Sequence, residues 1–145
     1  MKTLLAVLVS ALLVIGVAPV SAAAAPDTQL EGTTRRLHRI AKVPFISDMG
    51  NVWRTRGQEL RIADGRISVD TGCNRGRGKV HVLEETPELG PLATTLIGCE
   101  RRAAKIEKLI LKVLVDGAKW RIKDDRLRIS IIIGNYDYRL QYRAA

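Results

Sequence analysis

The chain has 145 residues, which leaves room for one domain and excludes a multidomain enzyme. Its formal net charge is +9, from 24 lysine and arginine residues against 15 aspartate and glutamate residues. The charges are scattered, with no run of five of one sign. Such a charge attracts anionic partners, from acidic lipids and teichoic acid to nucleic acid. The alternative is that the many arginines simply reflect a GC-rich genome.

Residues 1–24 have the layout of a cleavable signal peptide. Lys2 precedes the apolar run Leu4–Val17, and cleavage is expected after Ala23 or Ala24. This run is short of the roughly 20 residues that a membrane-spanning helix needs, so an uncleaved anchor is the less favoured alternative. No cysteine directly follows the run, which argues against a lipoprotein. We expect a periplasmic or secreted protein with no transmembrane segment in its mature chain.

A polar segment, residues 25–33, is expected to form a flexible lead-in to a domain that spans residues 34–143. Alternation of apolar and polar residues with period two then predicts strands at 36–40, 59–62, 66–69 and 79–82. Asp64-Gly65 is a favoured hairpin turn between two of them. Residues 42–57 contain Pro44, Gly50 and Gly57, and we interpret them mainly as a loop.

One segment, residues 100–115, has apolar residues at spacings of three and four, which predicts a helix with one apolar face. Its opposite face, which includes Glu107, is expected to be solvated. Alternating strands are again predicted at 119–123, 126–133 and 136–142. The expected fold is therefore α+β: a curled antiparallel sheet of about seven strands, exposed on one face and packed on one helix.

The stretch TGCNRGRG, Thr71–Gly78, contains one of the two cysteines and is open to several interpretations. It lacks the lysine and hydroxyl residue of a phosphate-binding P-loop, although backbone amides with nearby arginines could hold an anion. It has no CxxC pair for redox chemistry and no close ligand spacing for a metal. We favour a structural turn and predict no metal or cofactor. This turn would use the residues Gly72, Asn74, Gly76 and Gly78.

The two cysteines, Cys73 and Cys99, are expected to form a structural disulfide, because an exported chain with two cysteines usually joins them. The bridge would tie the turn to the start of the helix. Thr94 and Thr95, just before Cys99, could form a polar binding feature, but are more simply explained by hydrogen bonds within a loop.

The segments Leu30–Thr33, Thr71–Arg75 and Gly90–Thr95 resemble the META domain family, which includes the HslJ-like bacterial heat-shock proteins. The resemblance extends over residues 30–142. It implies a small antiparallel sheet curled around one helix, in envelope or secreted proteins that are tied to stress tolerance. Members of the family have no agreed enzymatic activity, so the resemblance supplies no catalytic residues. The chain departs from the family at Arg35-Arg36, where a tryptophan is usual.

The favoured function is that of an exported, non-enzymatic protein that supports envelope integrity or stress tolerance by binding an envelope protein or an anionic envelope polymer. No serine lies in a GxSxG elbow, and an enzyme is not supported. The alternatives are an inhibitor of a secreted hydrolase and a basic polyanion-binding module, with nucleic acid disfavoured as the ligand and a monomer as the default state. Candidate contact residues are Trp53, Arg54, Arg56, Arg75, Arg77, Arg101 and Arg102.

Overall fold

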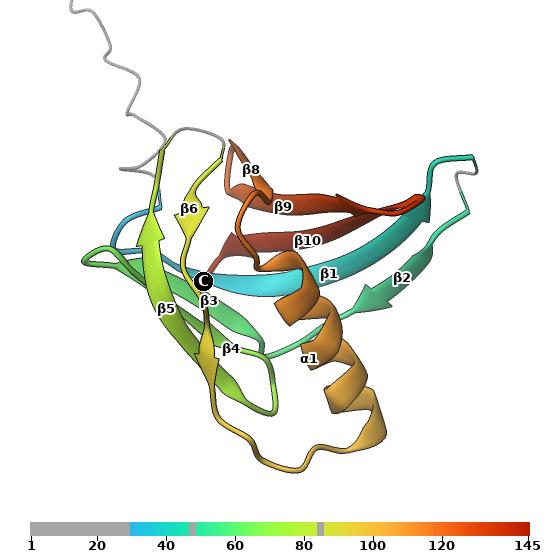
Figure 1. Cartoon of the computed structure of the whole chain (residues 1–145), viewed down its shortest axis with the longest axis horizontal. Coiled ribbons are helices and arrows are strands. Elements are labelled where there is room, and N and C mark those ends of the chain that lie inside the picture. The colour runs from blue at the N-terminus through green and yellow to red at the C-terminus, as the bar shows by residue number, and fades with distance from the viewer. Residues whose placement is uncertain (1–29, 47–48, 84–85) are drawn as a thin grey trace, which may run out of the picture.

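The computed structural model describes residues 30–46, 49–83 and 86–145 (Figure 1). The expected signal peptide, residues 1–24, lies outside the described residues, as does most of the expected lead-in. The last part of that lead-in is folded, because Leu30 is buried and Glu31 bridges Ile62 of the sheet. The ordered domain therefore begins before residue 34.

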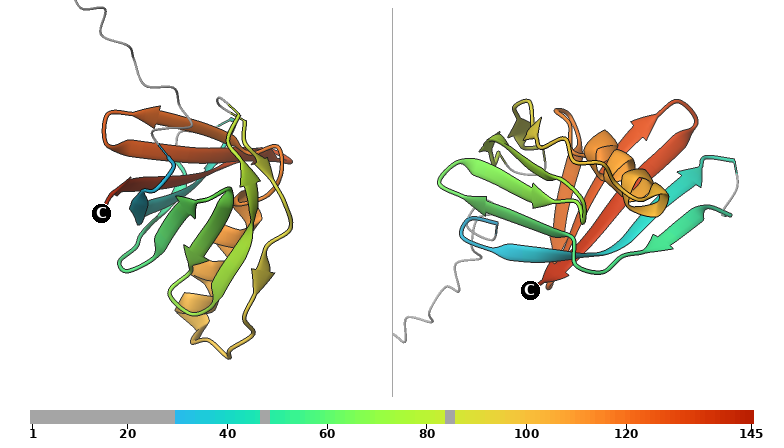
Figure 2. Two further views of the ribbon diagram at one scale, coloured as in Figure 1. Left: turned by 90° about the vertical axis from the view of Figure 1, so that its left-hand side faces the viewer. Right: turned by 90° about the horizontal axis from the view of Figure 1, so that it is seen from below.

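A curled antiparallel sheet and one helix make up the described fold (Figure 2). The elements are β1 (Thr34–Pro44), β2 (Asn51–Arg54), β3 (Glu59–Ala63), β4 (Arg66–Asp70), β5 (Arg75–His81), β6 (Glu88–Leu89), β7 (Ala93–Thr94), α1 (Arg101–Val113), β8 (Lys119–Lys123), β9 (Arg126–Ile133) and β10 (Tyr136–Ala144). The main strand order is β6-β5-β4-β3-β1-β10-β9-β8, with β2 paired to β1 and β7 paired to β5. Central β1 thus joins a β3–β4–β5 half to a β10–β9–β8 half.

The single helix and the antiparallel sheet agree with the predicted fold, but the strand count is higher than the predicted seven. Ten strands are present in the described residues, and two of them, β6 and β7, have only two residues each. The interpretation of residues 42–57 mainly as a loop was wrong for residues 42–44 and 51–54. Strand β1 runs on to Pro44, and β2 occupies residues 51–54, because β10 and β2 supply hydrogen-bonding partners on either side of β1.

The helix lies inside the curl of the sheet and completes its core (Figure 2). Ile106, Ile110 and Val113 form the buried stripe that the helical period predicts. They belong to one cluster with buried residues of the sheet, including Trp120 and Tyr142. The other side of the sheet, away from α1, is called the outer face here; its side chains alternate with the buried ones along each strand.

Arg35, of the Arg35-Arg36 pair where the resemblance implies a tryptophan, is buried. Its side chain occupies an inward position of β1 opposite Leu60, and its Nη1 donates a hydrogen bond to the backbone oxygen of Asp125 at 3.3 Å. Burial lowers the pKa of the Arg35 guanidinium, and the Asp125 carboxylate partly opposes this shift. The apolar stem of an arginine can be buried while its charged end reaches a polar partner, as Arg35 does here.

Candidate functional site

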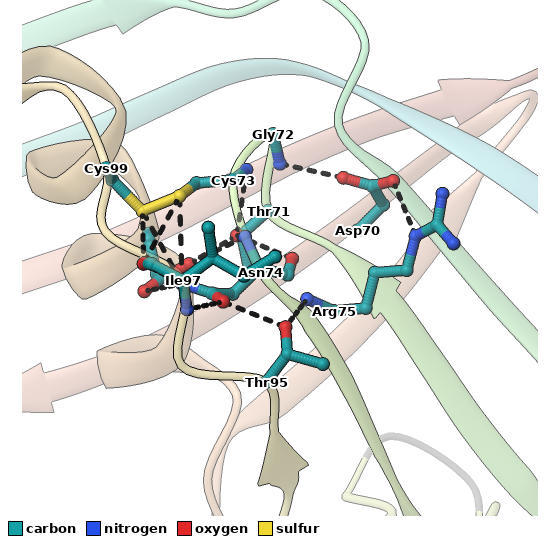
Figure 3. Close-up of a disulfide and its surroundings, with 10 residues drawn as sticks. Asp70, Thr71, Gly72, Cys73, Asn74, Arg75, Thr95, Ile97 and Cys99 are labelled. Atoms are coloured by element: carbon teal, nitrogen blue, oxygen red, sulfur yellow. Dashed lines mark hydrogen bonds and ion pairs between the residues drawn. A yellow bond between two sulfur atoms is a disulfide. The ribbon is translucent and has the colours of Figure 1, made fainter.

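The TGCNRGRG stretch forms the centre of a polar network around the side chain of Asn74, which we call the Asn74 hub (Figure 3). It consists of Thr71, Asn74, Thr95, Ile97 and Glu107. Thr71 and Asn74 come from the turn between β4 and β5, Thr95 and Ile97 from the segment before α1, and Glu107 from α1 itself. The hub therefore joins three parts of the chain that are distant in sequence.

The carboxamide of Asn74 is buried and satisfied at both ends. Its Oδ1 accepts hydrogen bonds from Thr95 Oγ1 and from the backbone nitrogen of Ile97, both at 2.8 Å. Its Nδ2 donates to Glu107 Oε1 at 3.1 Å and to the backbone oxygen of Ile97 at 3.2 Å. Only a side chain with both a donor and an acceptor can make this set of bonds, which accounts for an asparagine at this position.

Glu107 was expected on a solvated helix face, but the structure shows it half-buried against the turn. Its Oε2 accepts hydrogen bonds from Thr71 Oγ1 at 2.6 Å and from the backbone nitrogen of Asn74 at 3.1 Å, and its Oε1 accepts the Asn74 amide. Three donors therefore surround this half-buried carboxylate. A carboxylate held in this way anchors α1 to the turn and has little capacity left to act as a general base.

The disulfide between Cys73 and Cys99 closes the hub on one side. The two Cα atoms lie 5.9 Å apart, within the usual range for a disulfide. Ligand atoms of Cys73, Cys99 and Glu107 all lie within 4.8 Å of one another, as they would around a metal ion. The two sulfur atoms are bonded to each other, however, and thiolates are the form in which cysteine binds metals. In the disulfide form these residues do not fit a metal site.

The glycines of the turn differ in why they must be small. Gly72 has a φ of +85°, the left-handed conformation that glycine tolerates. Gly76 and Gly78 instead lie within β5, where a Cβ atom would come within 2.8 Å of Val69 Cγ1 or of Leu92 Cδ2, respectively. The stretch is therefore part turn and part strand, with the second part packed too closely for a side chain.

The six candidate arginines do not form one surface. Arg54, Arg56 and Arg102 line an open hollow of about 680 Å³ between β2 and the start of α1, together with Glu100 and His38. A second hollow of about 290 Å³ contains Arg75 and Arg77, beside Asp70 and Glu59 among other residues. Arg75 forms an exposed ion pair with Asp70 at 3.5 Å. Arg101 is exposed and lines neither hollow.

Trp53 is less exposed than a contact residue on a loop would be. It lies in β2 opposite Ile40 and packs, half-buried, against the core. The Nζ atom of Lys105 is 5.4 Å from the centre of its ring, a cation–π contact that links β2 to α1. This position points to a structural role for most of the ring.

The strand register also brings together a basic cluster that sequence reasoning missed. Arg39, Arg126, Arg128 and Arg143 line one hollow on the outer face of β1, β9 and β10. Arg54 of β2 lies opposite Arg39, between this cluster and the hollow beside α1, and we call the five arginines together the arginine face. Arg39 lies opposite Arg54, and Arg126 lies opposite Arg143. Alternating arginines are visible in the sequence, but only the strand register shows that they are neighbours.

His38 lies at the edge of the arginine face, at a bulge of β1. Its pKa responds to the positive electrostatic potential of these arginines. The pKa of this exposed imidazole is lowered, first by Arg143 and then by slight desolvation, Arg54, Arg39 and Arg126. Four of the five arginines therefore act on one side chain. The positive charges are close enough to oppose the addition of another.

Comparisons with known proteins address the family and the fold. The family model described as META domain matches residues 28–140. A solved structure described as the NMR structure of the protein from Burkholderia xenovorans is similar, with a TM-score of 0.58 and 21% identity, covering 90% of this chain and 99% of that one. A second NMR structure has a TM-score of 0.57 and 20% identity, covering 80% and 92%. At such identity both show the fold alone. No match was found among curated proteins.

Proposed function

The chain belongs to the META domain family, and we propose that it is an exported envelope protein that supports stress tolerance by binding, not by catalysis. The Asn74 hub is the observation that carries this proposal. Its carboxamide and its carboxylate are engaged with each other, and the two cysteines beside it are bonded together, so this polar site is a structural joint. Its interactions leave recognition to the surface.

A structural disulfide supports the proposed compartment, because such bonds persist in secreted and periplasmic proteins and are rare in reducing ones. No helix in the described residues has the length and hydropathy to cross a bilayer. The apolar, signal-like segment of residues 1–24 would supply the route of export.

The first test is the intact mass of the protein from its native compartment, with thiols blocked before any reduction. The proposal expects a chain cleaved near Ala24 with no blocked thiol. An uncleaved chain, or one with two blocked thiols, would contradict the compartment.

Binding is tested next by photo-crosslinking in living cells, with the probe at Arg128 or, as a comparison, at Arg77. No specific adduct from any surface position would argue against a binding role.

A polyanion-binding module is the second candidate function, and the arginine face favours it. None of Arg39, Arg54, Arg128 and Arg143 forms an ion pair with a carboxylate of the described residues. Unpaired arginines grouped on one face are available to an anionic partner. Inhibition of a secreted hydrolase, the other alternative, has no comparable feature in its favour.

A further inference from the structure

The register of the sheet arranges basic side chains of the outer face in rows that cross the strands. In one row, Arg121 of β8 lies opposite Arg128 of β9, Gln141 of β10 separates Arg128 from Arg39 of β1, and Arg39 lies opposite Arg54 of β2. In the next row, Lys123, Arg126, Arg143 and Arg36 follow one another in the same strand order. Neighbouring strands are about 4.8 Å apart, so like charges are brought close together.

This arrangement opposes folding, because like charges directly across from each other destabilise a sheet. Acidic side chains of the described residues relieve it at its margins. Arg126 contacts the exposed carboxylate of Asp125 at 3.8 Å, and Arg36 pairs with Glu59 at 3.0 Å. An anionic ligand would supply counter-charges to Arg39, Arg128 and Arg143, which lie between these margins.

We propose that the arginine face binds a linear phosphodiester polymer of the cell envelope, with one phosphate group in the hollow bordered by Arg39, Arg126, Arg128 and Arg143. This inference rests on the second candidate function, polyanion binding, and assigns to it a site and a chemical class of ligand. It also moves the anion site away from the TGCNRGRG turn and the start of α1, where the sequence placed most of the candidate arginines.

The hollow gives the proposal its local geometry. Its volume is about 150 Å³, and the four arginines line it together with His38 and Gln141, among other residues. That volume is room for a phosphate group with some water, since a water molecule takes up about 30 Å³ in the liquid. Guanidinium groups match the oxygens of phosphate in pairs, and they are less strongly hydrated than ammonium groups, which favours this ligand.

The shape of the sheet favours a flexible polymer over a membrane surface. The rows extend over several strands of a sheet that curls around α1, so the outer face is convex (Figure 2). A planar bilayer would touch only part of such a face. A flexible chain with one charge per repeat can follow the curvature and place successive phosphates near successive arginines.

The test measures binding of poly(glycerol phosphate) to the full, disulfide-bonded protein by titration calorimetry. The variant Arg39→Gln/Arg128→Gln/Arg143→Gln is expected to bind at least roughly tenfold more weakly, because each arginine replaced takes away part of the electrostatic attraction. The wild-type affinity should fall steeply between about 50 and 200 mM salt, as counterions are released on binding. Circular dichroism establishes that the variant folds, which is expected since the changes relieve repulsion.

The matched control removes three positive charges from the other half of the outer face, in Arg61→Gln/Arg66→Gln/Lys79→Gln. These side chains are exposed on β3, β4 and β5. The control is expected to bind within about threefold of wild type. An equal loss in the two triple variants would overturn the site, because net charge alone would then explain binding.

Two further ligands test the class of partner. Poly-glutamate of equal charge should bind several-fold more weakly than the phosphate polymer; equal binding would overturn the assignment to phosphate while leaving polyanion binding intact. If the protein binds vesicles that contain phosphatidylglycerol but does not bind the polymer, the polymer assignment is wrong and the ligand is a lipid surface. If the protein binds none of these anions, both the inference and the second candidate function are overturned. The first candidate function, binding of an envelope component, would still be tested by crosslinking in cells.

Discussion

Replacement of Asn74 by aspartate tests the hub with almost no change in shape. The substitution removes the Nδ2 donor to Glu107 Oε1 at 3.1 Å and to the Ile97 backbone oxygen at 3.2 Å. In its place stands a second carboxylate oxygen, close to that of Glu107. The variant therefore combines the loss of two hydrogen bonds with a repulsive interaction that depends on pH.

The magnitude follows from these two contributions. Two hydrogen bonds contribute about 2 kcal/mol to the free energy of unfolding. Two neighbouring carboxylates raise the pKa of one of them, and a shift of about two units is equivalent to about 3 kcal/mol. Because this pKa is raised in the folded state, the cost is absent below the unfolded pKa and develops as the pH rises through the folded one. Asn74→Asp should then cost about 5 kcal/mol at pH 7 and about 2 kcal/mol near pH 3.5.

Urea unfolding at the two pH values measures this difference, with the disulfide intact and the buried Trp120 as a fluorescent probe. Asn51→Asp is the matched control, since Asn51 is exposed at the start of β2 and should change the free energy of unfolding only slightly. A loss for Asn74→Asp that is the same at both pH values would refute the role of the Glu107 carboxylate. A loss below about 1 kcal/mol at pH 7 would refute the hub as a whole.

Three other features of the structure lead to shorter predictions. Replacing Cys73 and Cys99 by serine should lower the free energy of unfolding by about 3 kcal/mol in urea, because the bridge spans a sequence separation of 26 residues. NMR titration should give His38 a pKa below 6.5, and Arg143→Gln should raise it; since folding lowers this pKa, the wild type should lose stability relative to Arg143→Gln as the pH falls below about 6.5. Gly76→Ala should lower the unfolding midpoint, at a cost of about 1–3 kcal/mol, because its Cβ would lie 2.8 Å from a buried valine methyl.

Each of these has a control. The wild type in excess reductant should match the double serine variant, and a serine variant as stable as the oxidised protein would contradict a stabilising bridge. Arg66→Gln should leave the His38 titration unchanged, because Arg66 is not among the residues that lower its pKa; equal shifts in both variants would point to net charge. Gly98→Ala adds a Cβ with no atom within 4 Å and should be neutral.

The sequence predicted most strands because burial alternates along them, and it predicted the helix because buried residues recur there at spacings of three and four. The prediction from sequence failed where pairing with a distant strand determines the structure. Lys42–Pro44 has no clear alternation, but it forms a strand because it pairs with Tyr136–Tyr138 of β10. Glu107 was misplaced for a similar reason. Helical periodicity separates an apolar from a polar face, but it does not tell which loop packs against the polar one.

The candidate site was partly predictable. Cysteine pairing follows from composition and expected compartment, and the disulfide is present. The arginine face could not be predicted, because it depends on which strands are neighbours and on a bulge in β1 between Leu37 and Arg39 that shifts the register with β10. A shift of one residue reverses the face to which side chains point, so the same arginines could equally have been distributed over both faces.

The hub and the arginine face differ in what they offer a partner. In the hub, the carboxamide of Asn74 and the carboxylate of Glu107 satisfy each other, so a ligand would have to break existing hydrogen bonds before forming its own. On the arginine face the guanidinium groups of Arg39 and Arg128 have no acidic partner among the described residues, and repulsion between neighbouring charges falls when an anion binds. When an anion binds there, the guanidinium groups lose hydrating water and mutual repulsion and gain attraction to the anion. For that reason the exposed sheet, more than the TGCNRGRG turn, is where we expect this fold to recognise another molecule.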